Sequence, residues 1–374
     1  MLVQHRLVLL MGLLYYVFAG ITSEIISDHS DLLEAFSRGG CSPEFSSHRH
    51  ATPDPAVSDV VVVRLAFGRS GESASTGSYD RTRLIFRKLT EAGDSCVECF
   101  KTDDGVVVCV RELGVFRIAH GYVSCEIDPV APSERLSFLE DSYREFVIDI
   151  LLRYRSRFVL DAAGVSYNGH TVLLIGPSRS GKSTAAVALS LNGFGLVSDD
   201  RIILGMEKDG PHAAPYGTIS WLEQEIISHF RLREMGAFIR AVENSTKMAV
   251  DLEKSGLVQR EPGGPPSILL FPHLSGHASP AEFRRMTPAE TFIELNRNIQ
   301  HRGVATAAFV EQRTRVMKSA AERIPTFRLS LDRNLRTLDE LPSAIVSLIK
   351  ESTGLASAAF PVQHSTEDLS SSRF

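Results

Sequence analysis

One nine-residue stretch constrains this chain more than any other: residues 176–184 read Gly-Pro-Ser-Arg-Ser-Gly-Lys-Ser-Thr. They match the pattern G-x-x-x-x-G-K-[ST] at every fixed position, which here are Gly176, Gly181, Lys182 and Ser183. Glycines in such a loop let the backbone turn tightly and bring its N–H groups close to an anion. A helix after the loop would point its positive N-terminal end at the same anion. The stretch therefore predicts a phosphate-binding loop, called the phosphate loop below.

The flanking residues predict the strand and the helix that such a loop requires. Residues 158–165 form a first apolar strand, and an Asn-Gly pair at 168–169 is a strong hairpin-turn signal. Residues 171–175 are apolar and β-branched, as in a buried parallel strand. Residues 183–192 are good helix formers without a breaker, and Gly193 follows at the expected C-terminal position. The alternative is a glycine- and serine-rich turn that binds no ligand.

The side chains of the phosphate loop have separate expected roles. Lys182 would place its charge between the β- and γ-phosphates of a nucleotide, and Ser183 would offer its hydroxyl to Mg²⁺. Arg179 is either a phosphate clamp or a solvated loop-tip residue, since the variable positions of such loops usually point outward. The residues expected to bind the nucleotide are Gly176, Ser178, Arg179, Ser180, Gly181, Lys182, Ser183 and Thr184.

Two adjacent carboxylates, Asp199 and Asp200, follow the next apolar run at 195–198. A run that ends in carboxylates places them at the C-terminal edge of a strand, beside the phosphate loop. One would bind Mg²⁺ directly or through water, and the other would take the proton from a hydroxyl nucleophile. Because the two charges repel each other, a nearby cation is expected. The alternative is an Asp-Asp turn that caps the next segment.

The phosphate loop, a helix and then Asn-Gly-Phe-Gly-Leu-Val-Ser-Asp-Asp resemble the HPr kinase/phosphorylase catalytic domain. The chain is most similar to HPr-kinase-like proteins, whose fold is related to phosphoenolpyruvate carboxykinase. The short distance from the loop to the aspartates separates it from small GTPases and transporter ATPases. The likeness covers residues 158–350, and only the loop and the aspartate pair are specific. Looser matches lie at 215–221, Lys247, 267–271, 286–290 and 324–329.

The resemblance implies an α/β fold with a P-loop-containing, phosphoenolpyruvate-carboxykinase-like nucleotide domain. It implies transfer of the γ-phosphoryl group of ATP to a serine hydroxyl of a protein or peptide acceptor, with Mg²⁺ as cofactor. By the resemblance, Lys182 acts with Asp199 and Asp200 in catalysis, while Ser183 and Asp200 bind the metal.

One position departs from the family. Relatives commonly carry a histidine at the end of the preceding strand, where this chain has Asp161. The departure argues against the reverse, phosphorylase reaction. It also favours an alternative function, a nucleotide-binding regulatory or accessory module without phosphoryl transfer.

The remaining regions are assigned by pattern. Residues 57–130 hold short β-rich runs separated by glycine and aspartate, as in an N-terminal β-rich domain. Residues 131–157 read as an amphipathic linking helix, because apolar side chains recur there at helical spacing. The ATP-binding domain would span 158–350, including a short amphipathic helix at 341–349, and a serine-rich disordered tail would span 351–374.

The N-terminus carries a second, conflicting signal. Residues 1–22 resemble a signal peptide, with an apolar run at 7–18 after a short basic start, and that run is too short for a comfortable membrane span of roughly 20 residues. The alternatives are a buried helix or strand, or a start placed too early. Residues 23–56 are polar and are expected to be a linker.

Charge and cysteine content narrow the partners and the compartment. The net charge of −5 and the lack of a basic stripe argue against nucleic-acid binding. Five cysteines do not suggest a disulfide-stapled exported fold. We therefore expect a cytoplasmic protein whose partners are ATP and a protein or peptide acceptor, with membrane contact only through the N-terminal segment. The sequence leaves homo-oligomerisation open.

Overall fold

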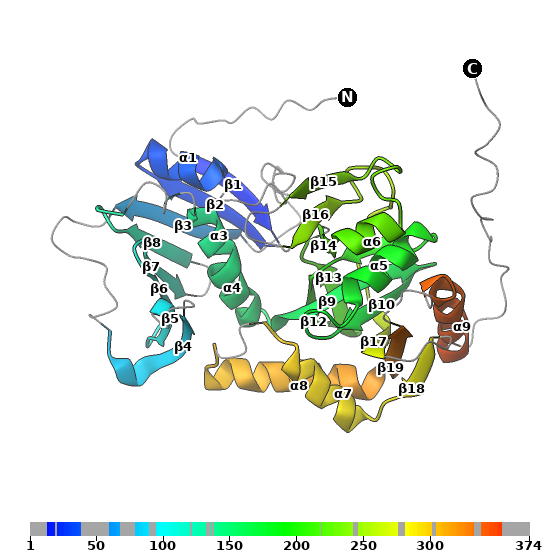
Figure 1. Ribbon diagram of the computed structural model, residues 1–374. Coiled ribbons are helices and arrows are strands. Elements are labelled where there is room, and N and C mark those ends of the chain that lie inside the picture. Colours follow the sequence, from blue (N-terminus) through cyan, green and yellow to red (C-terminus); the bar gives the residue numbers. More distant parts are fainter. Residues whose placement is uncertain are drawn as a thin grey trace, which may run out of the picture.

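The structure is a computed structural model with a mixed α/β fold, built around two large sheets and a three-stranded one. In Figure 1 the first sheet lies at the left, the second at the right, and α4 leads from one to the other. The described residues are 13–18, 21–38, 60–67, 79–89, 95–119, 122–131, 136, 138–217, 219–241, 246–275, 281–300, 304–332 and 338–353.

The first sheet has eight strands in the order β1-β2-β3-β8-β7-β6-β5-β4. Its last five strands form an antiparallel meander, while β2, β3 and β8 run parallel to one another. The meander agrees with the short β-rich runs predicted for this region. The strands are β1 (Leu13–Phe18), β2 (Ile21–Ser27), β3 (Val60–Phe67), β4 (Leu84–Leu89), β5 (Ser95–Lys101), β6 (Gly105–Val110), β7 (Gly114–Ala119) and β8 (Tyr122–Ile127), with a 3₁₀ turn at Arg81–Arg83 before β4.

The described part of the N-terminal region differs from its prediction. Residues expected to be signal-like or linker form β1, β2 and helix α1 (Ser30–Arg38), which join the first sheet. The interpretation missed α1 because only its buried face is apolar: Leu32, Leu33 and Phe36 recur at helical spacing among polar residues. Residues 1–12, 19–20 and 39–59 lie outside the described ranges. Among the described helices, none combines the length and the apolar character that a membrane crossing requires.

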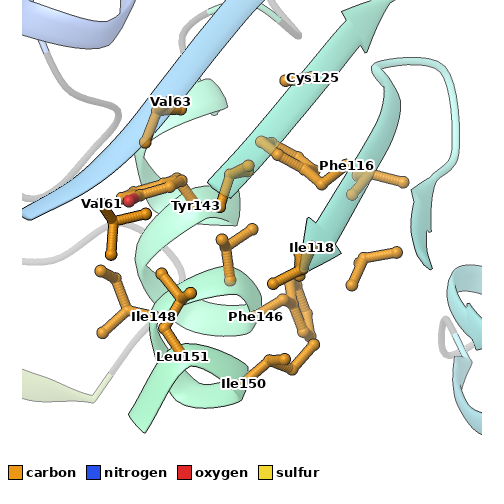
Figure 2. Close-up of a cluster of buried hydrophobic side chains, with 14 of the residues drawn as sticks. Val61, Val63, Phe116, Ile118, Cys125, Tyr143, Phe146, Ile148, Ile150 and Leu151 are labelled. Carbon is orange, nitrogen blue, oxygen red and sulfur yellow. The ribbon is translucent and has the colours of Figure 1, made fainter. Parts of the chain in front are cut away.

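The linking helix ends at Tyr154, before its predicted end at residue 157, and its middle is π-helical. It runs as α3 (Leu139–Ser142), a π-helical segment (Tyr143–Ile148) and α4 (Asp149–Tyr154). Its apolar side packs on the first sheet, as Figure 2 shows for Tyr143 and Phe146 against side chains of the strands. The same buried cluster extends into the second half of the chain, so the two large sheets share a continuous core.

The second sheet has the order β13-β12-β9-β10-β17-β19-β18, with β11 paired to β9. Strands β10, β17 and β19 are parallel, so their carboxyl ends meet at one edge. Helices α5 and α9 pack on one face and α7 and α8 on the other. The elements are β9 (Arg157–Tyr167), β10 (His170–Ile175), α5 (Lys182–Leu191), β11 (Gly195–Ser198), β12 (Arg201–Glu207), β13 (Gly210–Pro215), β17 (Pro266–Ser275), β18 (Glu282–Arg285), α7 (Pro288–Arg297), α8 (Ala307–Arg323), β19 (Thr326–Asp332) and α9 (Leu341–Thr353).

A three-stranded sheet stands over α5. It consists of β14 (Ser220–Glu223), β16 (Lys247–Asp251) and β15 (Phe238–Ala241), with α6 (Gln224–His229) between β14 and β15 in the chain. A separate apolar cluster, which includes Val187 of α5 and Leu222 of β14, holds this sheet against the helix. The small sheet thereby forms a second wall opposite the carboxyl edge of the large one.

Several local predictions are confirmed at this level. The strand before the phosphate loop, the helix after it and the hairpin between β9 and β10 are all present. Asn168 and Gly169 adopt φ of 49° and 79°, the two positive values that a type I′ turn requires. The division into domains stays a prediction, and the tail beyond residue 353 lies outside the described residues.

Candidate functional site

The phosphate loop connects the end of β10 to the start of α5. At its beginning, the N–H of Gly176 donates to the carbonyl of Asp161 on the neighbouring strand β9, at 3.2 Å. At its end, Gly181 has φ 97° and precedes the first residue of α5. A Cβ at Gly181 would lie 3.2 Å from Leu331 and 3.4 Å from Leu274, so both its conformation and its surroundings favour glycine. The loop is therefore held from both sides.

Lys182 is buried inside the loop, with 8% of its surface exposed. Its Nζ donates to the carbonyls of Gly176 at 2.7 Å and Pro177 at 2.8 Å. Burial lowers the pKa of Lys182, and the nearby charges of Asp161, Asp199 and Asp200 act in the opposite direction. A phosphate that reaches Lys182 has to replace these carbonyls as its partners.

Ser183 and Asp199 join the phosphate loop to the carboxylate pair. The Ser183 hydroxyl donates to Oδ1 of Asp199 at 3.0 Å. Asp199 is 2% exposed, and burial raises its pKa, while the N–H of Asp200 and the hydroxyls of Ser220 and Ser183 lower it. The Ser220 hydroxyl is near enough to act on that pKa, but neither it nor Oδ2 of Asp199 makes a hydrogen bond with another described residue. The oxygen Oδ2 is thus a buried acceptor that lacks a donor in the described part of the chain.

Asp200 differs from its neighbour in exposure and backbone conformation. Its side chain is 55% exposed, and its φ of 64° lies in the left-handed region that non-glycine residues rarely adopt. Hydrogen bonds fix the turn: the Asp199 N–H donates to the Gly217 carbonyl at 2.9 Å, and the Ala162 N–H donates to the Asp200 carbonyl at 3.2 Å. The turn therefore directs one carboxylate inward and the other toward solvent.

Asp161 lies on β9 beside the phosphate loop. Its N–H donates to the carbonyl of Asn298 at 2.8 Å, and its Oδ1 accepts a hydrogen bond from the side chain of Gln300. Of the charges that raise the pKa of Lys182, that of Asp161 acts most strongly. The residue that departs from the family pattern thus faces the loop lysine.

A cavity of about 400 Å³ opens over the phosphate loop. It brings most of the predicted residues together, whereas Gly176, Ser180 and Asp199 are buried below its surface. Arg179 is exposed at the loop tip, with φ 65°. The lining residues are Asp161, Ser178, Arg179, Gly181, Lys182, Ser183, Thr184, Asp200, Trp221, Leu222, Glu223, Glu225, Ile226, Lys247, Leu274, Leu331, Asp332 and Leu338.

The cavity also contains residues that the sequence interpretation did not place there. Asp332, which is 3% exposed, ends β19, and Leu274 lies near the end of β17. Both strands run parallel to β10, so their last residues share the edge of the loop. The runs at 267–271 and 324–329, which the sequence predicts to be strands, were the signal that could have placed Leu274 and Asp332 at this edge. The cation expected near the aspartates is Arg201, whose Nε lies 3.6 Å from Oδ2 of Asp200.

The donors at the loop suit a magnesium ion. They are the hydroxyl of Ser183 and the carboxylates of Asp199 and Asp200, and Mg²⁺ prefers oxygen ligands and keeps several waters. The buried acceptor Oδ2 of Asp199 is the kind of unsatisfied atom that an ion shell completes. In the described ranges no cluster of three or more His, Cys, Asp or Glu could hold a metal alone.

Comparisons with known proteins add little to this geometry. No family model matches the chain, and no curated protein matches it. Among solved structures, the HPr(Ser) kinase/phosphatase from Coxiella burnetii is similar at 12% identity, over 52% of this chain and 93% of that chain, with a TM-score of 0.30. A similarity at that TM-score assigns neither a fold family nor a function.

Proposed function

We propose that the chain is an ATP-dependent kinase of the HPr-kinase-like group, with a phosphoenolpyruvate-carboxykinase-like nucleotide domain around the phosphate loop. It would transfer the γ-phosphoryl group of ATP to a serine hydroxyl of a protein or peptide. The observation that carries the proposal is the 3.0 Å hydrogen bond between Ser183 and Asp199. It joins the phosphate loop to a carboxylate pair at the edge of a cavity of about 400 Å³, large enough for a nucleotide.

The residues would work by positioning and by charge neutralisation. Backbone N–H groups at the start of α5 lack intrahelical partners and would bind phosphate oxygens. Lys182 would exchange carbonyl partners inside the loop for the β- and γ-phosphates. These contacts would fix the γ-phosphorus at the carboxylate side of the cavity.

The carboxylates would divide the remaining work. Asp199 and Ser183 would hold Mg²⁺, which when bound would supply positive charge to neutralise the phosphates. Asp200 is the exposed member of the pair and lines the cavity, so it can reach an incoming serine hydroxyl and accept its proton. Asp200 would also provide a metal ligand through water.

A second function is favoured by Asp161. The charge of Asp161 acts on Lys182 more strongly than that of either other aspartate, and its Oδ1 is engaged by Gln300. A carboxylate at this place competes with a phosphate for the lysine. The alternative is therefore a nucleotide-binding regulatory or accessory module that does not transfer phosphate.

Labelled ATP with serine-containing acceptor proteins and peptides separates the two functions. Nucleotide binding is followed through Trp221, the single tryptophan of the chain, which lines the cavity. We expect Lys182→Ala to lose binding and transfer, and Asp200→Asn to keep nucleotide binding, with a higher Mg²⁺ requirement, but lose transfer. Lys318→Ala, an exposed substitution on α8, is the matched control. Binding without transfer to any acceptor supports the regulatory alternative, and unchanged binding in Lys182→Ala refutes both.

A further inference from the structure

The carboxylate that faces the cavity has a cationic neighbour. Nε of Arg201 lies 3.6 Å from Oδ2 of Asp200, and it is a buried donor that makes no hydrogen bond to any described residue. Arg201 is also directly opposite Asp161 in the register of β12 and β9. Residues directly opposite in an antiparallel pair point to the same face. Arg201 therefore lies beside the carboxylate of Asp200 and on the same face of the sheet as Asp161.

Tyr216 holds Arg201 on the side away from Asp200. The guanidinium lies over the Tyr216 ring, 5.4 Å from its centroid, and Nη1 donates to the phenolic oxygen at 3.5 Å. The Ser198 hydroxyl accepts from the Tyr216 N–H at 3.0 Å, and its one hydrogen lies between the carbonyls of Arg201 at 2.6 Å and Gly217 at 2.5 Å. A single hydroxyl thus ties together the backbones of both residues, directly beside the aspartate turn.

Tyr216 is anchored in turn on the π-helical segment. Its hydroxyl donates to the carbonyl of Arg144 at 3.4 Å. π-Helical turns leave the regular hydrogen-bond ladder and are frequent at functional sites. The segment is fixed from its other side, where Tyr143 and Phe146 are buried against the first sheet (Figure 2). A chain of contacts therefore runs from the first sheet through Tyr216 and Arg201 to Asp200.

We propose that Arg201 is a positioning residue, which holds the Asp200 carboxylate at the cavity, and that Tyr216 and the π-helical segment fix Arg201 in that role. The inference rests on the proposed nucleotide site. Arginine stays charged at every working pH and its planar group stacks on an aromatic ring, so it offers a constant, oriented partner. Asp200 sits in a left-handed turn with an exposed side chain, and among the described residues it makes no other ion pair.

The test measures Mg²⁺–ATP and Mg²⁺-free ATP binding through Trp221 fluorescence, and phosphate transfer separately. Arg201 does not line the cavity, so Arg201→Gln should leave Mg²⁺-free ATP affinity within about twofold of the native value. Groups that orient metal ligands typically contribute about 10- to 100-fold to metal affinity or activity. We expect Arg201→Gln to raise the Mg²⁺ concentration for half-maximal binding about tenfold, with Arg201→Lys between it and the native protein.

Tyr216→Phe gives an independent reading, because it keeps the ring under the guanidinium and removes only the hydroxyl. A shift of about threefold in the same Mg²⁺ dependence is expected, in the direction of Arg201→Gln. Arg315→Gln and Tyr122→Phe, both at exposed positions away from the cavity, are the matched controls. If Arg201→Gln does not fold, Tyr216→Phe decides.

The outcomes separate the two proposals. Native Mg²⁺ dependence in Arg201→Gln or, where that variant does not fold, in Tyr216→Phe overturns the role of Arg201 while leaving nucleotide binding intact. An equal loss of Mg²⁺-free and Mg²⁺-bound nucleotide affinity identifies a merely structural role and also overturns it. A native protein that binds no nucleotide refutes the proposed function, and the positioning role with it.

Discussion

Replacing Gly181 by alanine should damage nucleotide binding far more than stability, and Gly193 provides the control. Both glycines flank α5 and both are left-handed, with φ of 97° and 88°. A Cβ at Gly193 meets nothing within 4 Å, whereas one at Gly181 lies 3.2 Å from Leu331 and 3.4 Å from Leu274. The pair therefore separates backbone strain from crowding in the phosphate loop.

The expected free energies follow from these contacts. A left-handed alanine costs about 1–2 kcal/mol, partly offset by the lower entropy of its unfolded chain, so Gly193→Ala should lose about 1 kcal/mol of folding free energy. At Gly181 the crowding adds about 1–3 kcal/mol, because the side chain of Leu331 is buried and has to shift to make room for the Cβ. The loop can relieve that energy only by shifting its N–H groups. A shift that costs more than about 1.4 kcal/mol of binding free energy lowers nucleotide affinity over tenfold.

Thermal unfolding and Trp221 fluorescence test the pair together. We expect Gly193→Ala to lower the Tm by about 2–4 °C, the shift per kcal/mol for a domain of this size, with native nucleotide affinity. Gly181→Ala should lower the Tm somewhat more and lose at least about tenfold in affinity. Native nucleotide affinity in Gly181→Ala would refute the reasoning that the loop conformation makes the site.

Three further outcomes are expected. Burial raises the pKa of Asp199, so its charge destabilises the folded state increasingly as pH rises above the ordinary carboxyl pKa of about 4. Asp199→Asn should therefore raise the Tm at pH 7, a gain that disappears toward pH 4 in thermal scans, while the Mg²⁺ dependence of nucleotide binding is lost. Asp161→Asn removes the charge that most raises the pKa of Lys182, so Lys182 should lose its proton at a lower pH. Nucleotide affinity, measured as the pH is raised, should therefore begin to fall at a lower pH than in the native protein. Removal of Mg²⁺ with EDTA should weaken ATP binding in the native protein and change it little in Asp199→Asn.

The local structure around the phosphate loop was predictable, because each step has a strong local cause. The Asn-Gly turn, the apolar strand β10, the glycine-bounded helix α5 and the aspartates after β11 all follow from short-range preferences. The same holds for α7, where the sequence Thr-Pro-Ala-Glu makes a capping box between Thr287 and Glu290. Such signals need no knowledge of the rest of the fold.

The long-range parts were not predictable from one sequence. β1 pairs with its neighbour β2, but β2 joins the first sheet only by pairing with β3, far along the chain, and the apolar pattern of β1 was equally typical of an exported segment. The π-helical segment has an ordinary helical pattern, so nothing local marks its changed hydrogen bonding. Asp332 reaches the cavity only because β19 pairs with β17, which in turn pairs with β10.

The aspartate pair shows how the two kinds of information combine. Adjacency in sequence predicts repulsion and a nearby cation, and the structure supplies two cations in different ways. Lys182 belongs to the phosphate loop and would be drawn to phosphate, since its present partners are only carbonyls. Arg201 is held by Tyr216 and stays beside Asp200 whatever the cavity contains. A bound phosphate would therefore draw Lys182 away from the carboxylates, whereas Arg201 would remain beside Asp200 and, together with Mg²⁺, balance its charge while the nucleotide is bound.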